Sequence, residues 1–337
     1  MRFLATADLH IRKKEDVGVL ARILRAAEGH NAEAILIGGD LLDRPFPDEG
    51  TEEALRTLLG NAGRPVFLVA GNHDPLAVTD LYKELPENVR AFPEGLTCYT
   101  LGEGVRLFGY SAARELGQDR PLQGFTAPAG GVNILLAHGQ PDGNRDAFRP
   151  VSGEELSMSG LDLAILGHIH KQEQRLCGRC RLLVPGIPEG KGFDELGEKF
   201  VWLIDTNTWA VDPLAVAERF YREYPVDLSG CADDGEMLAR MQAVVIPENT
   251  VGRLILKGAP SADPATAAKV YTEQTGREVK DRTDPSLSVE LLRKQNTLQG
   301  AFVRKAMKEI EAAPAEDRPR LEEALKLGLQ ALKEAKL

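Results

Sequence analysis

The histidines of this chain are concentrated at the ends of short apolar segments, and this pattern constrains the fold more than any other feature. The chain has six histidines, and five of them follow such segments, with His30 as the exception. At 167–170 the sequence is G-H-I-H, so on an extended chain the two imidazoles point to the same side. Imidazoles gathered at strand ends predict a transition-metal site at one edge of a sheet.

Short apolar segments alternate with helical patterns through the first two hundred residues. Polar residues follow each segment, as expected for buried strands that end at a polar edge. This alternation predicts an α/β layered sheet with its site at the strand ends. Helices are predicted at 17–29 and 51–61, with Thr51 as the N-cap of the second. The predicted strands cover residues 2–6, 34–38, 66–70, 106–110, 132–137, 161–166 and 200–204.

Two shorter motifs fall inside this region. The sequence S-G-E-E at 152–155 has the capping-box pattern and predicts a helix start. The sequence C-G-R-C at 177–180 predicts a hairpin turn between two strands. Its Cys177 and Cys180 could also bind zinc, but zinc needs two more ligands, and no second pair is spaced to supply them. We therefore expect hairpin cysteines without a metal.

The pattern changes after residue 212. Strands are predicted at 220–228, 252–257 and 277–280, with helices at 234–243 and 264–274 between them. From residue 286 onward the pattern is helical, with two apolar stripes that either pack on the chain itself or bind a partner. We predict three parts, namely residues 1–212, a small α+β domain at 213–285, and a helical region at 286–337.

Composition limits the class of protein. The net charge of −10 argues against binding nucleic acid through the whole surface, although bound metal ions can create a local positive site. No segment reaches the ~18 apolar residues of a membrane span. Asp8 interrupts the place where a signal peptide would keep its apolar core, so the start is expected to be a first strand. Four cysteines in 337 residues do not form a disulfide framework, and we expect a cytoplasmic protein.

Seven polar residues at the strand ends are candidate metal ligands. They exceed the needs of one ion and fit two divalent ions that share a bridging carboxylate. Such a pair, ~3.5–4 Å apart, would clamp the attacking and leaving oxygens of a phosphoryl displacement. The candidates are Asp8, His10, Asp40, Asn72, His138, His168 and His170.

His73 is predicted to be catalytic rather than a ligand. It is adjacent to Asn72, so on an extended segment it points away from the ligand and into the substrate space. Asp43 would accept its ring N–H and hold it oriented, so that His73 stabilises the developing charge or protonates the leaving oxygen. The alternative is a histidine with only a structural role. Arg12, Lys13 and Lys14 either touch phosphates near the site or form a solvated helix start.

These motifs, in this order, resemble the calcineurin-like metallophosphoesterase superfamily over about residues 1–205. Its pattern of D-x-H, G-D-x-x-D, G-N-H-[DE], a later histidine and G-H-x-H is complete here. The resemblance implies a central β-sandwich with flanking helices, rather than the single sheet that alternation alone suggests, and two metal ions, manganese or iron. It also implies the division of ligands: Asp8, His10 and His170 for one ion, Asn72, His138 and His168 for the other, and Asp40 as the bridge.

Within the superfamily, the chain most resembles the DNA repair exonuclease branch of SbcD and YhaO type. The resemblance includes G-H-I-H-K at 167–171, P-G-I-P-E-G at 185–190 and F-D-E-L-G-E-K at 193–199, with Ile187 in place of the usual serine and Phe200 where glycine is common. The branch implies a capping domain that recognises DNA, a homodimer, and an SbcC-like coiled-coil ATPase that docks on the C-terminal helices.

Three functions therefore compete. The first is a manganese-dependent DNA nuclease that acts in DNA repair, as an exonuclease alone or also as an endonuclease. The second is a phosphodiesterase or phosphatase acting on small nucleotides with the same metals. The third is a scaffold that recruits the ATPase without catalysis. The complete ligand set and His73 argue against the scaffold, because a scaffold has no use for them.

Overall fold

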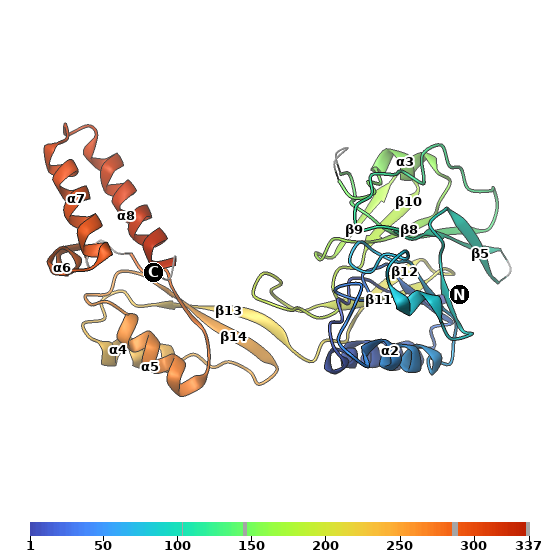
Figure 1. Cartoon of the computed structure of the whole chain (residues 1–337), viewed down its shortest axis with the longest axis horizontal. Helices are drawn as coiled ribbons and strands as arrows, with labels where there is room; N and C mark the ends of the chain where they lie inside the picture. Colours follow the sequence, from blue (N-terminus) through green and yellow to red (C-terminus); the bar gives the residue numbers. More distant parts are fainter. Residues whose placement is uncertain (103, 144–146, 285–288, 335–337) are drawn as a thin grey trace. The chain divides into compact units, whose positions relative to one another are not determined.

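A computed structural model gives the fold as two compact units, Met1–Phe220 and Tyr221–Leu337, shown in Figure 1. The predicted boundary at 285–286 lies outside the described residues, and the division into three parts stays a prediction. The structure describes residues 1–102, 104–143, 147–284 and 289–334.

The first unit contains two six-stranded sheets. In the first sheet, β1 to β4 are parallel, and β11 and β12 extend it antiparallel on one side. Three strands were not predicted, namely β4 and β12 here and β5 in the second sheet. In spatial order the first sheet consists of β12 (Ala210–Ala215), β11 (Phe200–Asp205), β1 (Arg2–Thr6), β2 (Ala34–Ile37), β3 (Val66–Leu68) and β4 (Val89–Ala91).

The second sheet has a parallel centre and antiparallel edges. The four central strands β6, β7, β8 and β10 are parallel, and β5 and β9 pair antiparallel at the two edges. In spatial order it consists of β5 (Thr97–Gly102), β6 (Val105–Tyr110), β7 (Val132–His138), β8 (Leu163–Gly167), β10 (Cys180–Val184) and β9 (Glu173–Cys177).

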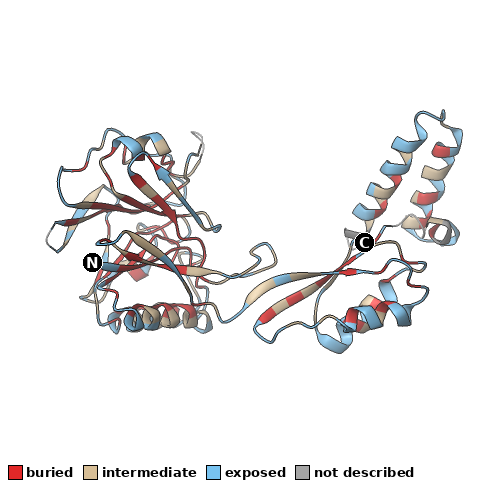
Figure 2. Ribbon diagram, turned by 180° about the vertical axis from the view of Figure 1, so that it is seen from behind, coloured by how far each residue is buried: buried red, intermediate tan, exposed pale blue. Residues whose placement is uncertain are grey.

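The two sheets pack face to face as a β-sandwich. Their inner faces share one apolar core, to which Leu36 and Phe67 contribute from the first sheet and Leu136 and Ile165 from the second. Figure 2 shows the strands of this unit largely in the colour of buried residues. The fold is therefore mixed α/β with the sandwich that the resemblance implied, and the single layered sheet expected from alternation was wrong. Alternation cannot separate the two arrangements, because a strand buried on both faces is apolar in either.

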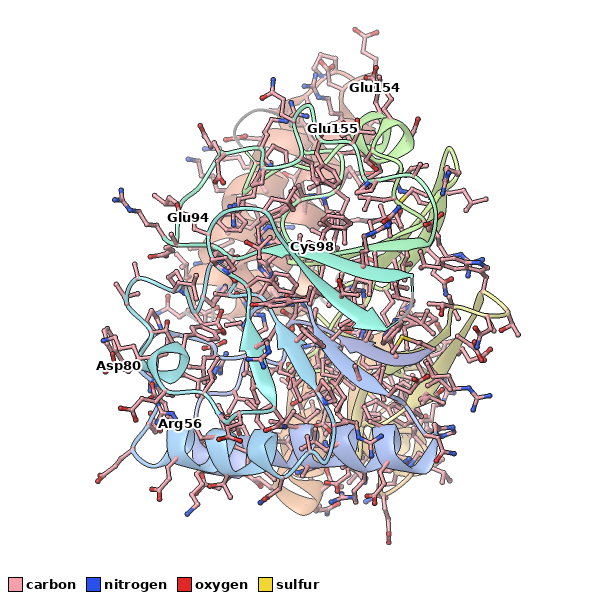
Figure 3. All side chains as sticks on the ribbon, turned by 90° about the vertical axis from the view of Figure 1, so that its right-hand side faces the viewer. Arg56, Asp80, Glu94, Cys98, Glu154 and Glu155 are labelled. Carbon is pink, nitrogen blue, oxygen red and sulfur yellow. The ribbon has the colours of Figure 1, made fainter. Side chains whose placement is uncertain are left out.

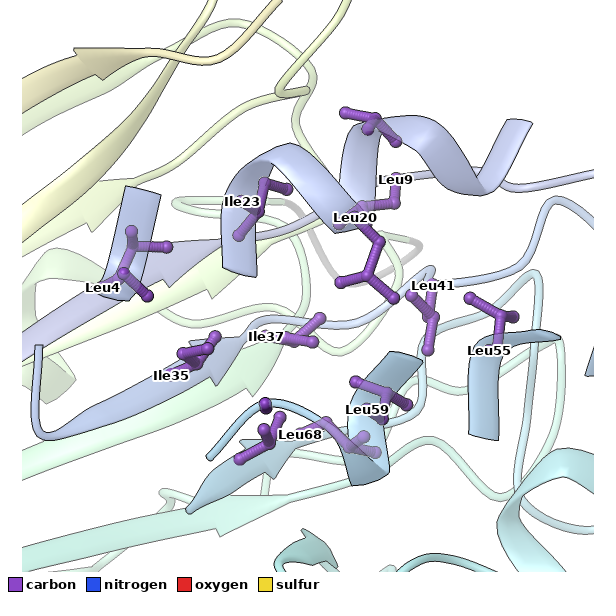
Figure 4. Close-up of a cluster of buried hydrophobic side chains, with 14 of the residues drawn as sticks. Leu4, Leu9, Leu20, Ile23, Ile35, Ile37, Leu41, Leu55, Leu59 and Leu68 are labelled. Carbon is purple, nitrogen blue, oxygen red and sulfur yellow. The ribbon is translucent and has the colours of Figure 1, made fainter. Parts of the chain in front are cut away.

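Helices cover the outer faces of the sandwich. The helices α1 (Gly18–Gly29) and α2 (Thr51–Gly60) pack on the first sheet, where Ile23 and Leu59 meet Ile35 and Ile37, as Figure 4 shows. Residues alternate in direction along a strand, so β2 sends Ile35 and Ile37 to the helices and Leu36 to the other sheet. The remaining short helices of this unit are η1 (Lys14–Val17), η2 (Asp80–Lys83) and α3 (Gly153–Met158).

The helix starts were predicted with mixed success. At α3 the Ser152 hydroxyl accepts from the Glu155 N–H, and the Glu155 carboxylate accepts from the Ser152 N–H, which confirms the capping box. Figure 3 labels Glu155 at this helix start. At α2 the N-cap is Gly50, in a left-handed conformation with φ of 75°, so the prediction of Thr51 was wrong. Glycine reaches that conformation without a Cβ penalty, and Thr51 becomes the first helical residue.

The predicted hairpin at 177–180 is confirmed. Cys177 and Cys180 face each other across the β9–β10 register, and both are free and buried. Gly178 supplies the positive φ of 60° that the two-residue turn requires. The pair packs with Leu182 in the core under the second sheet, which gives the two thiols a packing role.

The second unit combines a small three-stranded sheet with helices. The sheet, in the order β13-β14-β15, packs with α4 and α5 around Met237, Leu254 and Tyr271. Helices α6, α7 and α8 form a separate core in which Ile310 and Leu325 are buried, so these members of the two stripes pack on the chain itself. No helix in the described part of the chain combines the length and apolar character that a bilayer crossing demands. The elements are β13 (Phe220–Asp227), α4 (Asp234–Gln242), β14 (Thr250–Lys257), α5 (Ala265–Thr275), β15 (Val279–Asp281), α6 (Val289–Lys294), α7 (Leu298–Ala312) and α8 (Arg318–Glu334).

Candidate metal centre

The carboxyl ends of the parallel strands from both sheets meet at one edge of the sandwich, and the predicted ligands lie there. Asp8 and His10 follow β1, Asp40 follows β2 and Asn72 follows β3, all in the first sheet. From the second sheet, His138 is the last residue of β7, and His168 and His170 follow β8. All seven predicted ligands are therefore brought together from segments far apart in the sequence.

The backbone at this edge is held in conformations that side chains rarely adopt. Asp8, His10, Asp40 and His168 have positive φ values of 54°, 46°, 49° and 99°. Left-handed conformations of non-glycine residues are costly and are concentrated at functional sites, because the surrounding structure must enforce them. Here the Asp8 N–H donates to Gly39 O and the His10 N–H to Asp40 O, both at 3.0 Å, which fixes the loops after β1 and β2 to each other.

Glycines in the motifs make room for the candidate ligands. A Cβ on Gly71 would lie 2.0 Å from Asp40 Oδ1, and a Cβ on Gly39 would lie 2.3 Å from His138 Nδ1. Neither distance is compatible with a side chain, since non-bonded heavy atoms are separated by at least about 3 Å. The glycine of G-D and that of G-N-H are therefore required by the close packing of Asp40 and His138.

One group of donor atoms contains His10, His170 and Asp8. His10 Nε2 lies 3.0 Å from His170 Nε2. The ligand atoms of Asp8, His10 and His170 all lie within 4.8 Å of one another. Two ring nitrogens that face each other at this distance, beside a carboxylate, can share a cation as ligands.

A second group contains Asn72, His138 and His168. Asn72 Oδ1 lies 3.1 Å from both His138 Nε2 and His168 Nδ1. Asp40 lies between the two groups, because its Oδ2 is 3.3 Å from His138 Nε2 and 3.8 Å from His10 Nε2. This is the position that a carboxylate shared by two cations would occupy.

Hydrogen bonds determine which ring nitrogens face the site. His138 Nδ1 donates to the Gly38 carbonyl at 2.8 Å, because a carbonyl oxygen can only accept, so Nε2 is turned toward Asp40 and Asn72. His170 Nδ1 lies 2.6 Å from Glu195 Oε1, which leaves its Nε2 facing His10. Partners of this kind orient metal-bound histidines and fix their tautomer.

The charges of the site depend on burial. Burial lowers the pKa of His10 and of His168 to about 4, so both rings are neutral near pH 7 and their lone pairs are available. Burial also raises the pKa of the Asp8 carboxyl to about 6. For His138, burial opposes the charged form, but the carboxylates of Asp40 and Asp8 outweigh it and raise the pKa to about 9. A cation at His138 Nε2 would take the place of this proton.

The donor set fits two divalent cations. Asp8 and Asp40 are 0% and 2% exposed, and among the described residues their only ion-pair partners are histidines. Buried carboxylates without lysine or arginine need another positive charge, which a metal ion supplies. Imidazole nitrogens with carboxylate and amide oxygens suit borderline to hard ions such as manganese, iron or zinc.

His73 and Asp43 are placed differently from the prediction in one respect. The His73 ring is exposed beside the donor set, and its Nδ1 donates to the main-chain carbonyl of Asp43 at 2.9 Å, not to the carboxylate. The Asp43 carboxylate instead accepts from Arg12 Nε at 2.8 Å and lies 3.4 Å from His10 Nδ1. The predicted contact between the Asp43 carboxylate and His73 was wrong, because that carboxylate accepts from the neighbouring Arg12 guanidinium instead.

Four supporting residues were not predicted. Asp74 accepts from the N–H groups of Gly71 and Leu42, and burial raises its pKa to about 7. Phe148 packs 5.4 Å from the His168 ring, measured between centroids. Glu195 orients His170 and accepts from the Lys191 N–H, while the Lys191 ammonium donates to His10 O at 2.9 Å. Asp74 closes the G-N-H-[DE] motif and Glu195 lies in the motif at 193–199, but neither motif indicates what these residues contact.

Comparison with known proteins identifies the family. The model of the calcineurin-like phosphoesterase family matches residues 1–172, about half of the chain. The chain belongs to this family. Members are metal-dependent phosphoesterases with a dinuclear metal site, which agrees with the two groups of donors around Asp40. The chain is also 26% identical to an uncharacterized metallophosphoesterase, YhaO of Bacillus subtilis, over 77% of this chain and 70% of that protein.

Solved structures match this chain at lower sequence identity. The protein TT1561 of Thermus thermophilus matches with a TM-score of 0.45 and 17% identity, over 64% of this chain and 98% of that one. The phosphoesterase Yfce of E. coli matches with a TM-score of 0.36 and 18% identity, over 64% of this chain and 100% of that one.

Proposed function

We propose that this calcineurin-like phosphoesterase is a nuclease that hydrolyses phosphodiester bonds in DNA with two divalent ions, most effectively manganese. The observation that supports hydrolysis is the convergence of seven donor side chains in two groups around Asp40. The choice of DNA depends on the sequence resemblance to the repair exonuclease branch at 167–171, 185–190 and 193–199. Glu195, from the last of these motifs, contacts the candidate ligand His170.

The chain's own residues would share the work as follows. One ion would be held by Asp8, His10 and His170, and the other by Asn72, His138 and His168. Asp40 would be a ligand of both ions. Bound there, the ions would neutralise the phosphate oxygens and activate water for attack on phosphorus. Glu195 and the Gly38 carbonyl would keep His170 and His138 in the tautomers that ligation requires.

His73 would act on the leaving group. Its Nδ1–H is engaged by the Asp43 carbonyl, so Nε2 is the nitrogen that can carry a proton toward the substrate. The ring is exposed beside the donor set, with its centroid 4.7 Å from that of His10. A protonated imidazole at this position would stabilise the developing charge and give its proton to the departing oxygen. Asp43 would be a positioning residue, holding His73 through its main-chain carbonyl.

A second candidate function is hydrolysis of small nucleotides by the same donor set. The observation that favours it is the pocket of about 460 Å³ beside His73, a volume suited to a small molecule. Both functions use the same metals and the same His73, so the substrate assay separates them. A scaffold without catalysis is the least supported alternative, since it gives no role to the oriented histidines.

The test compares substrates under one metal condition. With manganese, the full chain is expected to degrade linear DNA and to cleave bis-p-nitrophenyl phosphate, and a chelator should abolish both activities. Cyclic and linear small nucleotides are assayed in parallel. Fast turnover of a nucleotide without cleavage of DNA would favour the second function over the nuclease. If no diester is hydrolysed, the scaffold is the one proposed function that remains.

We further propose an SbcC-like coiled-coil ATPase as a partner, bound by the C-terminal helices, and a homodimer as the assembly. The observation is that Leu298 on α7 and Leu327 on α8 are 61% and 59% exposed, whereas other apolar residues of these helices, such as Ile310 and Leu329, are buried. Leu298→Asp and Leu327→Asp are expected to reduce co-purification with such an ATPase at least about tenfold. Val245→Asp, at another exposed apolar residue of this unit, is the control. Unaltered co-purification by both leucine variants would exclude this docking surface, and light scattering measures the dimer.

A further inference from the structure

A pocket of about 460 Å³ opens directly beside the candidate metal centre. Three loops line it, those after β2, β3 and β6, and they contribute Asp43, His73 and Ala113 among others. Asn72, which belongs to the donor set, lines it as well. A phosphate held by the donor set therefore has this pocket as its immediate neighbour, on the side of His73. The volume lies within the range of about 300–1,000 Å³ that is typical of small-molecule sites.

The wall of the pocket is largely apolar. Pro45, Pro75, Val78 and Ala113 line it, and Val78 is 45% exposed. Phe46, which follows Pro45 in the sequence, is 66% exposed. Apolar side chains left exposed around one opening are typical of a binding site, because burying them against a ligand removes them from water.

Two arginines accompany this apolar wall. Arg44 and Arg114 line the pocket, in a chain whose net charge is −10. Arg44 is paired with Asp48, whereas Arg114 is exposed and has no salt-bridge partner within the described ranges. Two acids also line the pocket: Asp43 is already engaged by Arg12, and Glu115, next to Arg114 in the sequence, is exposed to solvent. Guanidinium groups beside apolar walls suit a ligand with a flat ring and a negative charge, since arginine both stacks on rings and pairs with phosphate.

Main-chain hydrogen bonds hold the walls in place. Leu76 N donates to Ala112 O at 3.0 Å and Ala77 N to Ala113 O at 3.1 Å, which joins the loop after β3 to the loop after β6. Arg149, only 2% exposed, fastens the loop after β6 by donating to Asp119 and to the Ser111 carbonyl. The pocket is therefore built into the structure before a ligand arrives, which lowers the entropic cost of binding.

We propose that this pocket binds the nucleoside next to the phosphate under attack, with its base between the apolar walls and Arg44 and Arg114 on the neighbouring phosphate or base edge. This inference rests on the proposed function and adds to it a defined nucleotide subsite. A base can stack on such walls whatever its identity, because every base has an apolar face. The pocket would thus recognise a nucleotide unit without selecting a sequence.

Equilibrium binding to the full, manganese-loaded chain tests the proposal without relying on turnover. Thymidine 5′-monophosphate is expected to bind at least about tenfold more tightly than inorganic phosphate, since only the nucleotide fills the pocket. Val78→Glu and Arg114→Ala should each remove most of this preference. Both residues are exposed enough that their replacement leaves the core intact. Val245→Glu, the same change at an exposed valine in the second unit, is expected to keep the preference.

The outcomes separate the subsite from the proposed function. Equal affinity for the nucleotide and for inorganic phosphate would overturn the proposed subsite. Retention of the preference in both Val78→Glu and Arg114→Ala would also overturn it. Hydrolysis of bis-p-nitrophenyl phosphate, which carries no nucleoside, is followed separately and reports on the phosphodiesterase function whatever the binding result.

Discussion

Replacement of Asp40 by alanine is expected to remove at least one of two bound cations and to lower the rate of phosphodiester hydrolysis by more than about 10³-fold. Losing an outer partner of a ligand already costs about 10- to 100-fold, and Asp40 is the carboxylate that lies between both groups of donors. Nearby cationic groups, His138 above all, outweigh burial and keep the pKa of Asp40 well below its ordinary value. It is therefore a carboxylate at any pH at which the protein is assayed.

Metal content per chain, measured by inductively coupled plasma mass spectrometry, is the decisive observation for Asp40. Asp40→Asn serves as a second variant, because it keeps an oxygen for the His73 N–H and changes little volume. Asp212→Ala is the matched control, at an exposed aspartate on the edge strand β12 of the same sheet. Two retained ions in a folded Asp40→Ala protein would contradict the bridging role, even if activity were lost.

The polar residues at the strand ends predicted where the candidate ligands lie, whereas the alternation of strands and helices did not predict the second sheet. All seven candidate ligands meet in space, because each lies at or just after the carboxyl end of a parallel strand, and these ends share one edge. A strand such as β2, with Ile35 and Leu36 on opposite faces, is apolar throughout, so its sequence does not reveal whether a helix or a second sheet covers it. Only the resemblance to a known family distinguished the sandwich from a single sheet.

Side-chain partners were the least predictable level. The Asp43 carboxylate was expected to accept from the His73 ring. Instead it accepts from Arg12, and the main-chain carbonyl of Asp43 accepts from the ring. Glu195 was visible in a motif, yet it contacts His170, 25 residues earlier, only because the segment after β10 returns to the end of β8. Such contacts depend on how the loops lie relative to one another, and a local pattern of polar and apolar residues does not encode that arrangement.

Replacement of His73 by alanine is expected to lower kcat by about 10²- to 10⁴-fold while both cations are retained, because loss of a general acid has an effect of this size. The exposed ring lines the pocket beside the donor set and is held by a hydrogen bond to the Asp43 carbonyl, so its removal should leave the fold intact. His30→Ala is the matched control, since His30 is exposed at the end of α1 and is the one histidine outside the strand-end motifs.

The leaving group discriminates between the possible roles of His73. If His73 gives its proton to the departing oxygen, the loss of rate should be large for DNA, whose leaving alkoxide is strongly basic. For bis-p-nitrophenyl phosphate the loss should be small, because the nitrophenolate departs without a proton. Equal losses on both substrates would assign His73 to charge stabilisation alone. Unchanged rates on both, in a protein with two bound ions, would reduce it to a structural residue and remove the acid from the proposed mechanism.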